Sequence, residues 1–340
     1  FNDVNPRRRD IGFHNIFDHY REYNKLNNIS QDSIQFHYHP LAPIKDANRS
    51  GTTFLNSANI YTILARKIID RLWFPAAYRP GFHTERPDIN WFLEQWIPFD
   101  LGNQAVEGED NNQPDLAGAR FGDWRKAPVS WIPYHPDFYD YQEIGNCNRY
   151  IARCLNMEAR IRELKPDDID LAFREAKEKG KALLAFTNHD FRNMAPEIDK
   201  IWNMIKQVSA NYEDVKFLHQ GVVQGFRKTL RLNKGKPPEL DIEISHKKSY
   251  AKFIVEANNE IFGVQPFLAL KSKTQEYIWQ NFDFEARNIW SYTFDYANID
   301  IDAIEKIGVA ANSTNGITEI LVLDVKTERI EKEILNTEKV

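Results

Sequence analysis

The sequence has little cysteine and no long hydrophobic run. Only Cys147 and Cys154 occur among 340 residues, too few for a disulfide framework, which fits a reducing compartment such as the cytoplasm. No apolar run approaches the roughly 20 residues that a membrane-spanning helix needs, so we expect no membrane span. The formal net charge is -5, and nothing in it favours nucleic acid or an anionic membrane surface as a partner.

The rest of the composition is that of a globular protein with a sizeable core. Hydrophobic residues make up 42% and charged residues 27%, both ordinary values for such proteins. Aromatic residues reach 13% and include eight Trp. Exposed aromatic rings often stack on sugar rings, although core packing is the better explanation for any single one of them. The first residue is Phe, so we expect that further residues precede it and could carry a localisation signal.

Hydrophobic periodicity predicts alternating helices and strands over residues 1–233. The spacing predicts helices at 13–26, 53–72, 88–96, 166–179, 196–208 and 220–232. It predicts strands at 33–40, 98–101 and 215–218, and two more that begin at Phe74 and Ala182, while residues 150–155 fit either a strand or a helix. Such a rhythm indicates parallel β/α units, with one further strand expected before the first helix.

The spacing of hydrophobic residues changes to a period of two after residues 234–238, which resemble a linker. Seven short strands then follow within residues 237–328: 240–244, 251–255, 267–270, 277–279, 290–294, 306–310 and 318–323. Their spacing predicts an antiparallel β-sandwich as a second domain. Residues 329–340 are expected to form a tail.

Two histidines lie at the carboxyl end of the first predicted strand, in the segment 33–40 (SIQFHYHP). His37 and His39 point the same way on an extended chain, with Cα atoms about 6–7 Å apart. Two imidazoles so placed can share one divalent metal ion. The alternative is a pair of polar side chains at a strand end.

Further polar residues follow other strands. Arg79 and His189 each come at the carboxyl end of a predicted strand, and Asp123 lies in the long loop after 98–101. In a barrel these ends converge on one face. Asp190, next to His189, can serve catalysis or cap the helix that follows. Such a set suits metal-assisted hydrolysis of an amide or ester, with a histidine as general acid.

The order His-x-His, Arg-Pro, Asp-Trp and Asn-His-Asp resembles that of the NodB-type polysaccharide deacetylases over about residues 10–220. The likeness is to divergent members found among bacterial surface-polysaccharide proteins. It implies a deformed (β/α) barrel, zinc or another divalent metal on His37 and His39, and removal of acetyl groups from an N-acetylated sugar. It also implies that Arg79-Pro80 supports a catalytic base, that Asp123-Trp124 is the groove motif, and that His189 is the acid.

The sequence departs from the family pattern at two points. Only Tyr38 separates the two histidines, where the family has three residues, and the family's paired aspartates are expected before Phe1. An inactive glycan-binding protein on the same scaffold is therefore one alternative. A glycoside hydrolase with two carboxylates drawn from Asp123, Asp137 and Asp190 is another.

The long loop at 102–136 supplies further candidates for substrate binding. Trp131 and Tyr134 could stack on sugar or pack beneath the loop, and His135 could contact sugar. His83 and His135 are also candidates for a third metal ligand.

Overall fold

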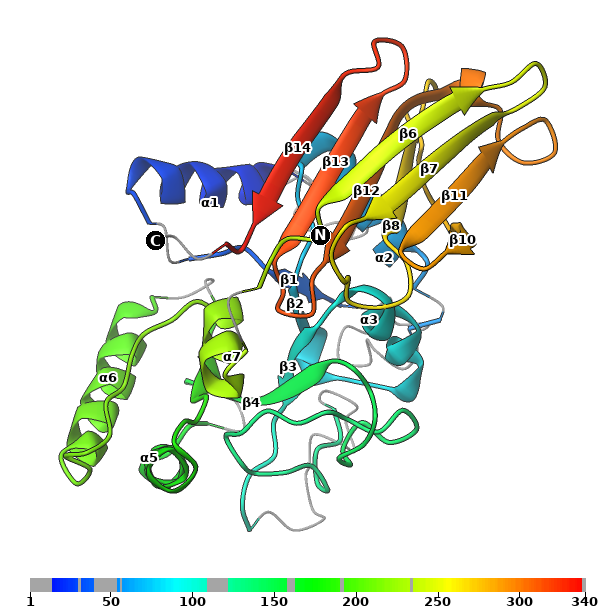
Figure 1. The fold of residues 1–340 in the computed structure, drawn as a ribbon. Coiled ribbons are helices and arrows are strands. Elements are labelled where there is room, and N and C mark those ends of the chain that lie inside the picture. Colours follow the sequence, from blue (N-terminus) through cyan, green and yellow to red (C-terminus); the bar gives the residue numbers. More distant parts are fainter. Residues whose placement is uncertain are drawn as a thin grey trace, which may run out of the picture.

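The computed structural model describes residues 14–29, 32–39, 54–55, 57–108, 122–157, 163–189, 193–232 and 235–337. It is a mixed α/β protein with one parallel sheet and two antiparallel sheets (Figure 1). Asp190 and the predicted tail beyond residue 337 lie outside these ranges.

The parallel sheet has five strands in sequence order and curls into half a barrel. The strands are β1 (Phe36–Tyr38), β2 (Ala77–Pro80), β3 (Phe99–Asn103), β4 (Tyr150–Asn156) and β5 (Ala185–Thr187). The expected parallel β/α architecture is thus confirmed at this level. The undecided segment 150–155 is a strand, and six of the seven β4 residues are buried.

Six α-helices among the described residues match the predicted ones. They are α1 (Asn15–Leu26), α2 (Asn59–Arg71), α3 (Asn90–Trp96), α5 (Pro166–Lys179), α6 (Ala195–Ser209) and α7 (Val222–Leu230). Three short 3-10 turns accompany them: η2 (Gly81–His83), η3 (Pro87–Ile89) and η4 (Ile301–Ala303). The strand predicted at 215–218 is wrong, because this segment is irregular and Leu218 is 70% exposed.

The two faces of the parallel sheet pack against different helices. Tyr38 and Tyr78 belong to a core cluster with Leu64 of α2, on what we call the α2 face. Ala77 and Phe99 are cross-strand neighbours on the opposite face, where they pack with Phe226 of α7. We call this the α7 face. Because side chains alternate along a strand, His37 and Arg79 project from the α7 face.

The antiparallel sheets form the predicted β-sandwich, with two strands more than expected within the continuously described residues 235–337. One sheet has the order β10-β11-β7-β6 and the other β14-β13-β12-β8-β9. The strands are β6 (Leu240–His246), β7 (Ala251–Ala257), β8 (Phe267–Ser272), β9 (Tyr277–Gln280), β10 (Asp283–Ala286), β11 (Ile289–Phe294), β12 (Ile304–Asn312), β13 (Thr318–Asp324) and β14 (Ile330–Leu335). The predicted tail is wrong over β14, which pairs antiparallel with β13.

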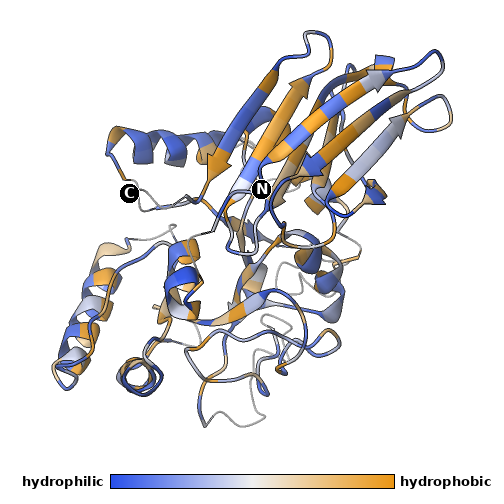
Figure 2. Ribbon diagram, viewed as in Figure 1, coloured by the Kyte–Doolittle hydropathy of each residue, from blue (hydrophilic) through white to orange (hydrophobic). Residues whose placement is uncertain are grey.

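The sheet that contains β12 is covered on both of its faces. One face meets the other antiparallel sheet in a shared core cluster that includes Phe253 and Val309. The other face places Phe267 and Ile320 in the cluster around α2. A Cβ atom on Gly308 would lie 2.7 Å from Cγ2 of Ile68, so strand and helix are in close contact. The hydropathy colouring shows β13 apolar along most of its length and β14 largely polar (Figure 2).

Among the described residues, no helix combines the length and the apolar character that crossing a membrane requires.

Candidate functional site

His37 and His39 meet at the carboxyl end of β1. Their Nε2 atoms lie 2.9 Å apart, and the rings stand nearly perpendicular. The His37 Nδ1 atom is 2.8 Å from the backbone carbonyl of Arg79. A carbonyl can only accept, so this contact places a proton on Nδ1 and leaves a lone pair on Nε2. The His39 Nε2–H group then donates to that lone pair.

Arg79 is the cross-strand neighbour of His37, and His83 completes the cluster. The Arg79 Nη2 atom lies 3.3 Å from His37 Nε2, and Nη1 lies 3.3 Å from His83 Nε2. The His83 Nδ1 atom faces the carbonyl of Gly102 at 3.2 Å. This second carbonyl fixes the same tautomer in His83, so its Nε2 atom also accepts a hydrogen bond from the guanidinium.

A strained turn holds His83 in place. Phe82 and His83 have φ angles of 53° and 48°, which place two consecutive non-glycine residues in the left-handed region. Each such residue costs on the order of 1 kcal/mol or more. The Nε1–H group of Trp124 donates to the His83 carbonyl at 2.8 Å, and the Phe82 ring packs against His39 edge-on, 4.7 Å away.

Burial keeps the histidines neutral. Loss of solvent and, to a smaller extent, the Arg79 cation lower the pKa of His39 to about 4. Burial likewise places the pKa values of His37 and His83 well below their usual value, again with a contribution from Arg79. All three rings are therefore uncharged at neutral pH, as metal ligation or hydrogen-bond acceptance requires.

His189 acts on this cluster through its charge. It lies two residues beyond β5, and it is exposed. Its charge acts on both His39 and His83 and lowers their pKa values. The structure thus brings together the predicted early pair, Arg79 and the predicted late histidine. His83, which the sequence offers only as a candidate third ligand, belongs to the same cluster.

The other predicted site residues do not join the histidines. The Asp123 carboxylate forms a bidentate pair with Arg125, at 2.9 and 2.7 Å. Trp124 is buried and reaches the cluster only through its bond to the His83 backbone. Asp190, adjacent to His189 in the sequence, falls outside the described residues.

Tyr134 and His135 lie near the amino end of β4. Tyr134 pairs with Ile151, and the His135 ring lies 3.9 Å from that of Tyr150, the first residue of β4. Trp131 is 1% exposed in a core cluster with Leu155, and its Nε1–H group donates to the Asp168 carbonyl. The packing alternative describes Trp131 and Tyr134, and His135 lies away from the histidines, which gather at the carboxyl ends of the strands.

A group of buried acidic side chains lies next to the cluster, and no pattern in the sequence predicts it. Arg149 contacts Glu94, Asp100 and Glu85 with N–O distances of 2.9, 3.3 and 3.5 Å. The side chains of Arg149, Asp100 and Glu85 are fully buried. Burial and the neighbouring Asp100 raise the pKa of Glu85 well above its usual value. Glu85 therefore retains a proton, which it can share with Asp100.

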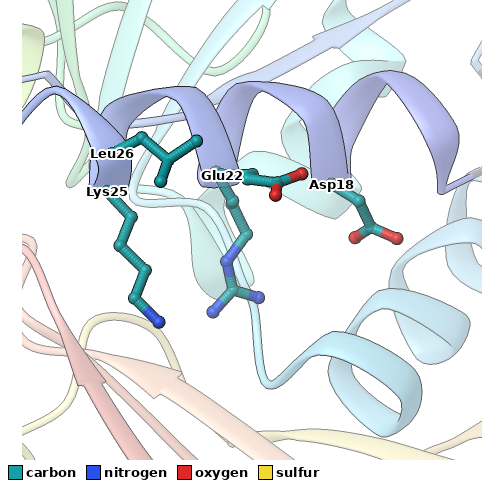
Figure 3. A pocket seen from close by; sticks show the side chains of 5 residues that line it. Asp18, Glu22, Lys25 and Leu26 are labelled. Carbon is teal, nitrogen blue, oxygen red and sulfur yellow. The ribbon is translucent and has the colours of Figure 1, made fainter.

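The described residues contain no group of three or more His, Cys, Asp or Glu side chains arranged around a metal position. Two nitrogens bound to one tetrahedral zinc ion are about 3.3 Å apart, so the His37–His39 pair needs to open by about 0.4 Å to hold one. A separate surface hollow of about 440 Å³ lies along α1, lined by Asp18, Arg21, Glu22, Lys25 and Leu26 (Figure 3). It is away from the histidines.

Comparisons with family models, with curated proteins and with solved structures found no match for this chain.

Proposed function

We propose that this chain is a metal-dependent hydrolase that removes acetyl groups from an N-acetylated sugar or polysaccharide. Its parallel sheet would then belong to a barrel of the polysaccharide-deacetylase type, with the β-sandwich appended. The observation that carries the proposal is the His37–His39 pair, whose Nε2 atoms face each other 2.9 Å apart at the carboxyl end of β1. The two free buried cysteines agree with a cytoplasmic location in a bacterium.

The two histidines suit a divalent ion in their chemistry. Both are neutral, and the Arg79 carbonyl orients the His37 ring so that Nε2 carries its lone pair. His39 would hold the ion through Nε2 after moving its proton from Nε2 to Nδ1. A carbonyl behind a ligating imidazole is the usual outer contact of a metal-bound histidine. A bound divalent ion would supply a Lewis acid and an acidified water molecule.

The other residues of the cluster have separate tasks in this proposal. Arg79 orients His37 through its backbone carbonyl, which accepts the Nδ1–H, and the exposed His189 would donate a proton to the departing amine. The alternative of a two-carboxylate glycoside hydrolase gains no support. Asp123 is paired with Arg125, and Asp137 accepts hydrogen bonds from the amides of Tyr139 and Asp140.

Metal content and acetate release test the proposal together. We expect the purified full-length protein, with the residues expected before Phe1, to bind one Zn²⁺ per molecule and to release acetate from an N-acetylglucosamine oligomer. His37→Ala and His39→Ala should lose the metal and the activity, whereas His189→Ala should keep the metal and lose activity by about 10²-fold or more. His135→Ala is the matched control and should change neither. Equal zinc affinity in His37→Ala and the parent chain would refute the proposal.

A further inference from the structure

Arg79 carries a positive charge that no carboxylate balances within the described residues. Its guanidinium contacts are the two imidazole nitrogens of His37 and His83. The ionisable groups that act on its charge are Cys154 and Tyr78, which are uncharged at neutral pH. A half-buried cation without a counter-ion is costly, because desolvation is not offset by an ion pair.

The two imidazoles orient the guanidinium but do not neutralise it. Each has its Nδ1 proton directed at a backbone carbonyl, Arg79 O for His37 and Gly102 O for His83. The His83 lone pair therefore faces Nη1, and the His37 lone pair is shared between Nη2 and the His39 Nε2–H group. The planar Arg79 guanidinium, hydrogen-bonded at both Nη atoms, keeps its full charge and a fixed orientation. Such a guanidinium recognises carboxylate and phosphate groups.

The local backbone is built to keep His83 beside Arg79. Two consecutive residues at positive φ, and the Trp124 hydrogen bond to the His83 carbonyl, hold the ring against the guanidinium. Strain of this kind persists only where the surrounding structure imposes it, and it gathers at ligand sites. Structural packing alone would not require an unbalanced charge and two strained residues at the same point.

We propose that Arg79, clamped between His37 and His83, is an oxyanion-binding subsite that takes the carboxylate or phosphate group of an acidic sugar. The sugar part of this inference rests on the proposed function, whereas the binding of an oxyanion does not. The substrate class then becomes a uronic acid or a phosphate-bearing sugar, with its anionic group at the carboxyl end of β2.

Direct titration tests the subsite. The purified chain is titrated calorimetrically with inorganic phosphate, D-glucuronate and glucose, first as purified and then with a chelator, so that binding to metal is separated from binding to Arg79. We expect phosphate or glucuronate to bind in both conditions, with an affinity that falls as salt rises, and glucose not to bind. Preference between the two anions tells a phosphate site from a carboxylate site.

Three variants and one control locate the binding. Arg79→Gln should weaken anion binding by about tenfold or more, and Arg79→Lys by less, since a lysine keeps the charge and loses the fork. His83→Asn should weaken it several-fold with the fold retained, because asparagine tolerates positive φ. Arg174→Gln, on the exposed face of α5, should bind like the parent chain.

The inference is overturned if the parent chain binds neither anion, if glucose binds equally well, or if Arg79→Gln and Arg79→Lys both bind like the parent. Its failure can be told apart from that of the proposed function. Anion binding without acetate release would support the subsite and refute the proposed hydrolase. Acetate release without anion binding would support the hydrolase and refute the subsite.

Discussion

A Cβ atom on Gly81 would lie 2.4 Å from Cγ of His39. The turn after β2 therefore packs its backbone directly against the ring, and only glycine leaves room for it. We predict that Gly81→Ala displaces His39 and lowers zinc affinity by about tenfold or more, since one ligand is worth several kcal/mol in such sites. Zinc titration measures this effect.

Gly225→Ala is the control for that variant. Its added methyl group would meet only the flexible end of Leu183, at 2.9 Å, within the helix α7. The variant should keep the parent zinc affinity. An unchanged affinity in Gly81→Ala would show that His39 is not a ligand.

Much of the parallel sheet could be predicted because its elements carry local signals. Helix α5 begins at Pro166 with acidic residues in its first turn and ends at Gly180 in the left-handed conformation. β4 had no clear period because it is buried on both faces, so its type depended on its neighbours. β14 was missed because Glu331, Lys332 and Glu333 make an exposed edge strand look like a polar tail.

The candidate site was predictable only in part. The His37–His39 pair follows from strand alternation, whereas the role of His83 depends on a turn with two positive φ angles and on the distant Gly102 carbonyl. The aromatic residues of the long loop did not identify the site either, because their burial depends on the folded structure. Composition cannot tell the buried Trp131 from Trp91, which is 61% exposed.

Arg149 faces three acidic side chains behind the site, of which Glu85 holds a proton, so its loss should be severe. We predict that Arg149→Met lowers the free energy of unfolding by about 3–5 kcal/mol, because the Asp100 carboxylate remains buried without its cation. Urea unfolding measures the loss. Lys200→Met removes the exposed pair with Glu163 and should cost less than about 1 kcal/mol. Similar losses in both variants would contradict this account.

Glu85 should make stability depend on pH. Its pKa in the folded chain lies well above the usual value of about 4.5, so the folded state holds a proton that the unfolded state releases. The contribution of Glu85 to stability is therefore fully present below about pH 4.5 and is lost as pH rises toward the folded-state pKa, by up to about 1.4 kcal/mol per pH unit. Glu85→Gln keeps a donor for Asp100 and should remove this slope.

Urea unfolding of the parent chain and Glu85→Gln between pH 5 and 8.5 measures the difference. The variant should gain stability relative to the parent as pH rises. Glu143→Gln, exposed in the loop before β4, should follow the parent at every pH. Parallel curves for the parent and Glu85→Gln would mean that Glu85 is ionised in the folded protein.

Asn312 joins the sandwich to the parallel sheet at a buried point. Its Nδ2 atom donates to the carbonyls of Pro75 and Trp96, at 2.8 and 2.7 Å. We predict that Asn312→Ala lowers the free energy of unfolding by about 2–4 kcal/mol, because two buried carbonyls lose their donor. Asn312→Asp should cost at least as much, since a carboxylate cannot donate to either carbonyl.

Hydrogen exchange in the parent chain and in Asn312→Ala shows whether the β-sandwich and the parallel sheet unfold as one unit. The sandwich and α2 share a core through Phe267 and Ile320. We therefore expect β4 and β12 to lose their protection at the same denaturant midpoint. Asn211→Ala, at an exposed position after α6, should leave that midpoint unchanged. Two separate midpoints in the parent chain would mean that the sandwich folds independently of the sheet that carries the histidines.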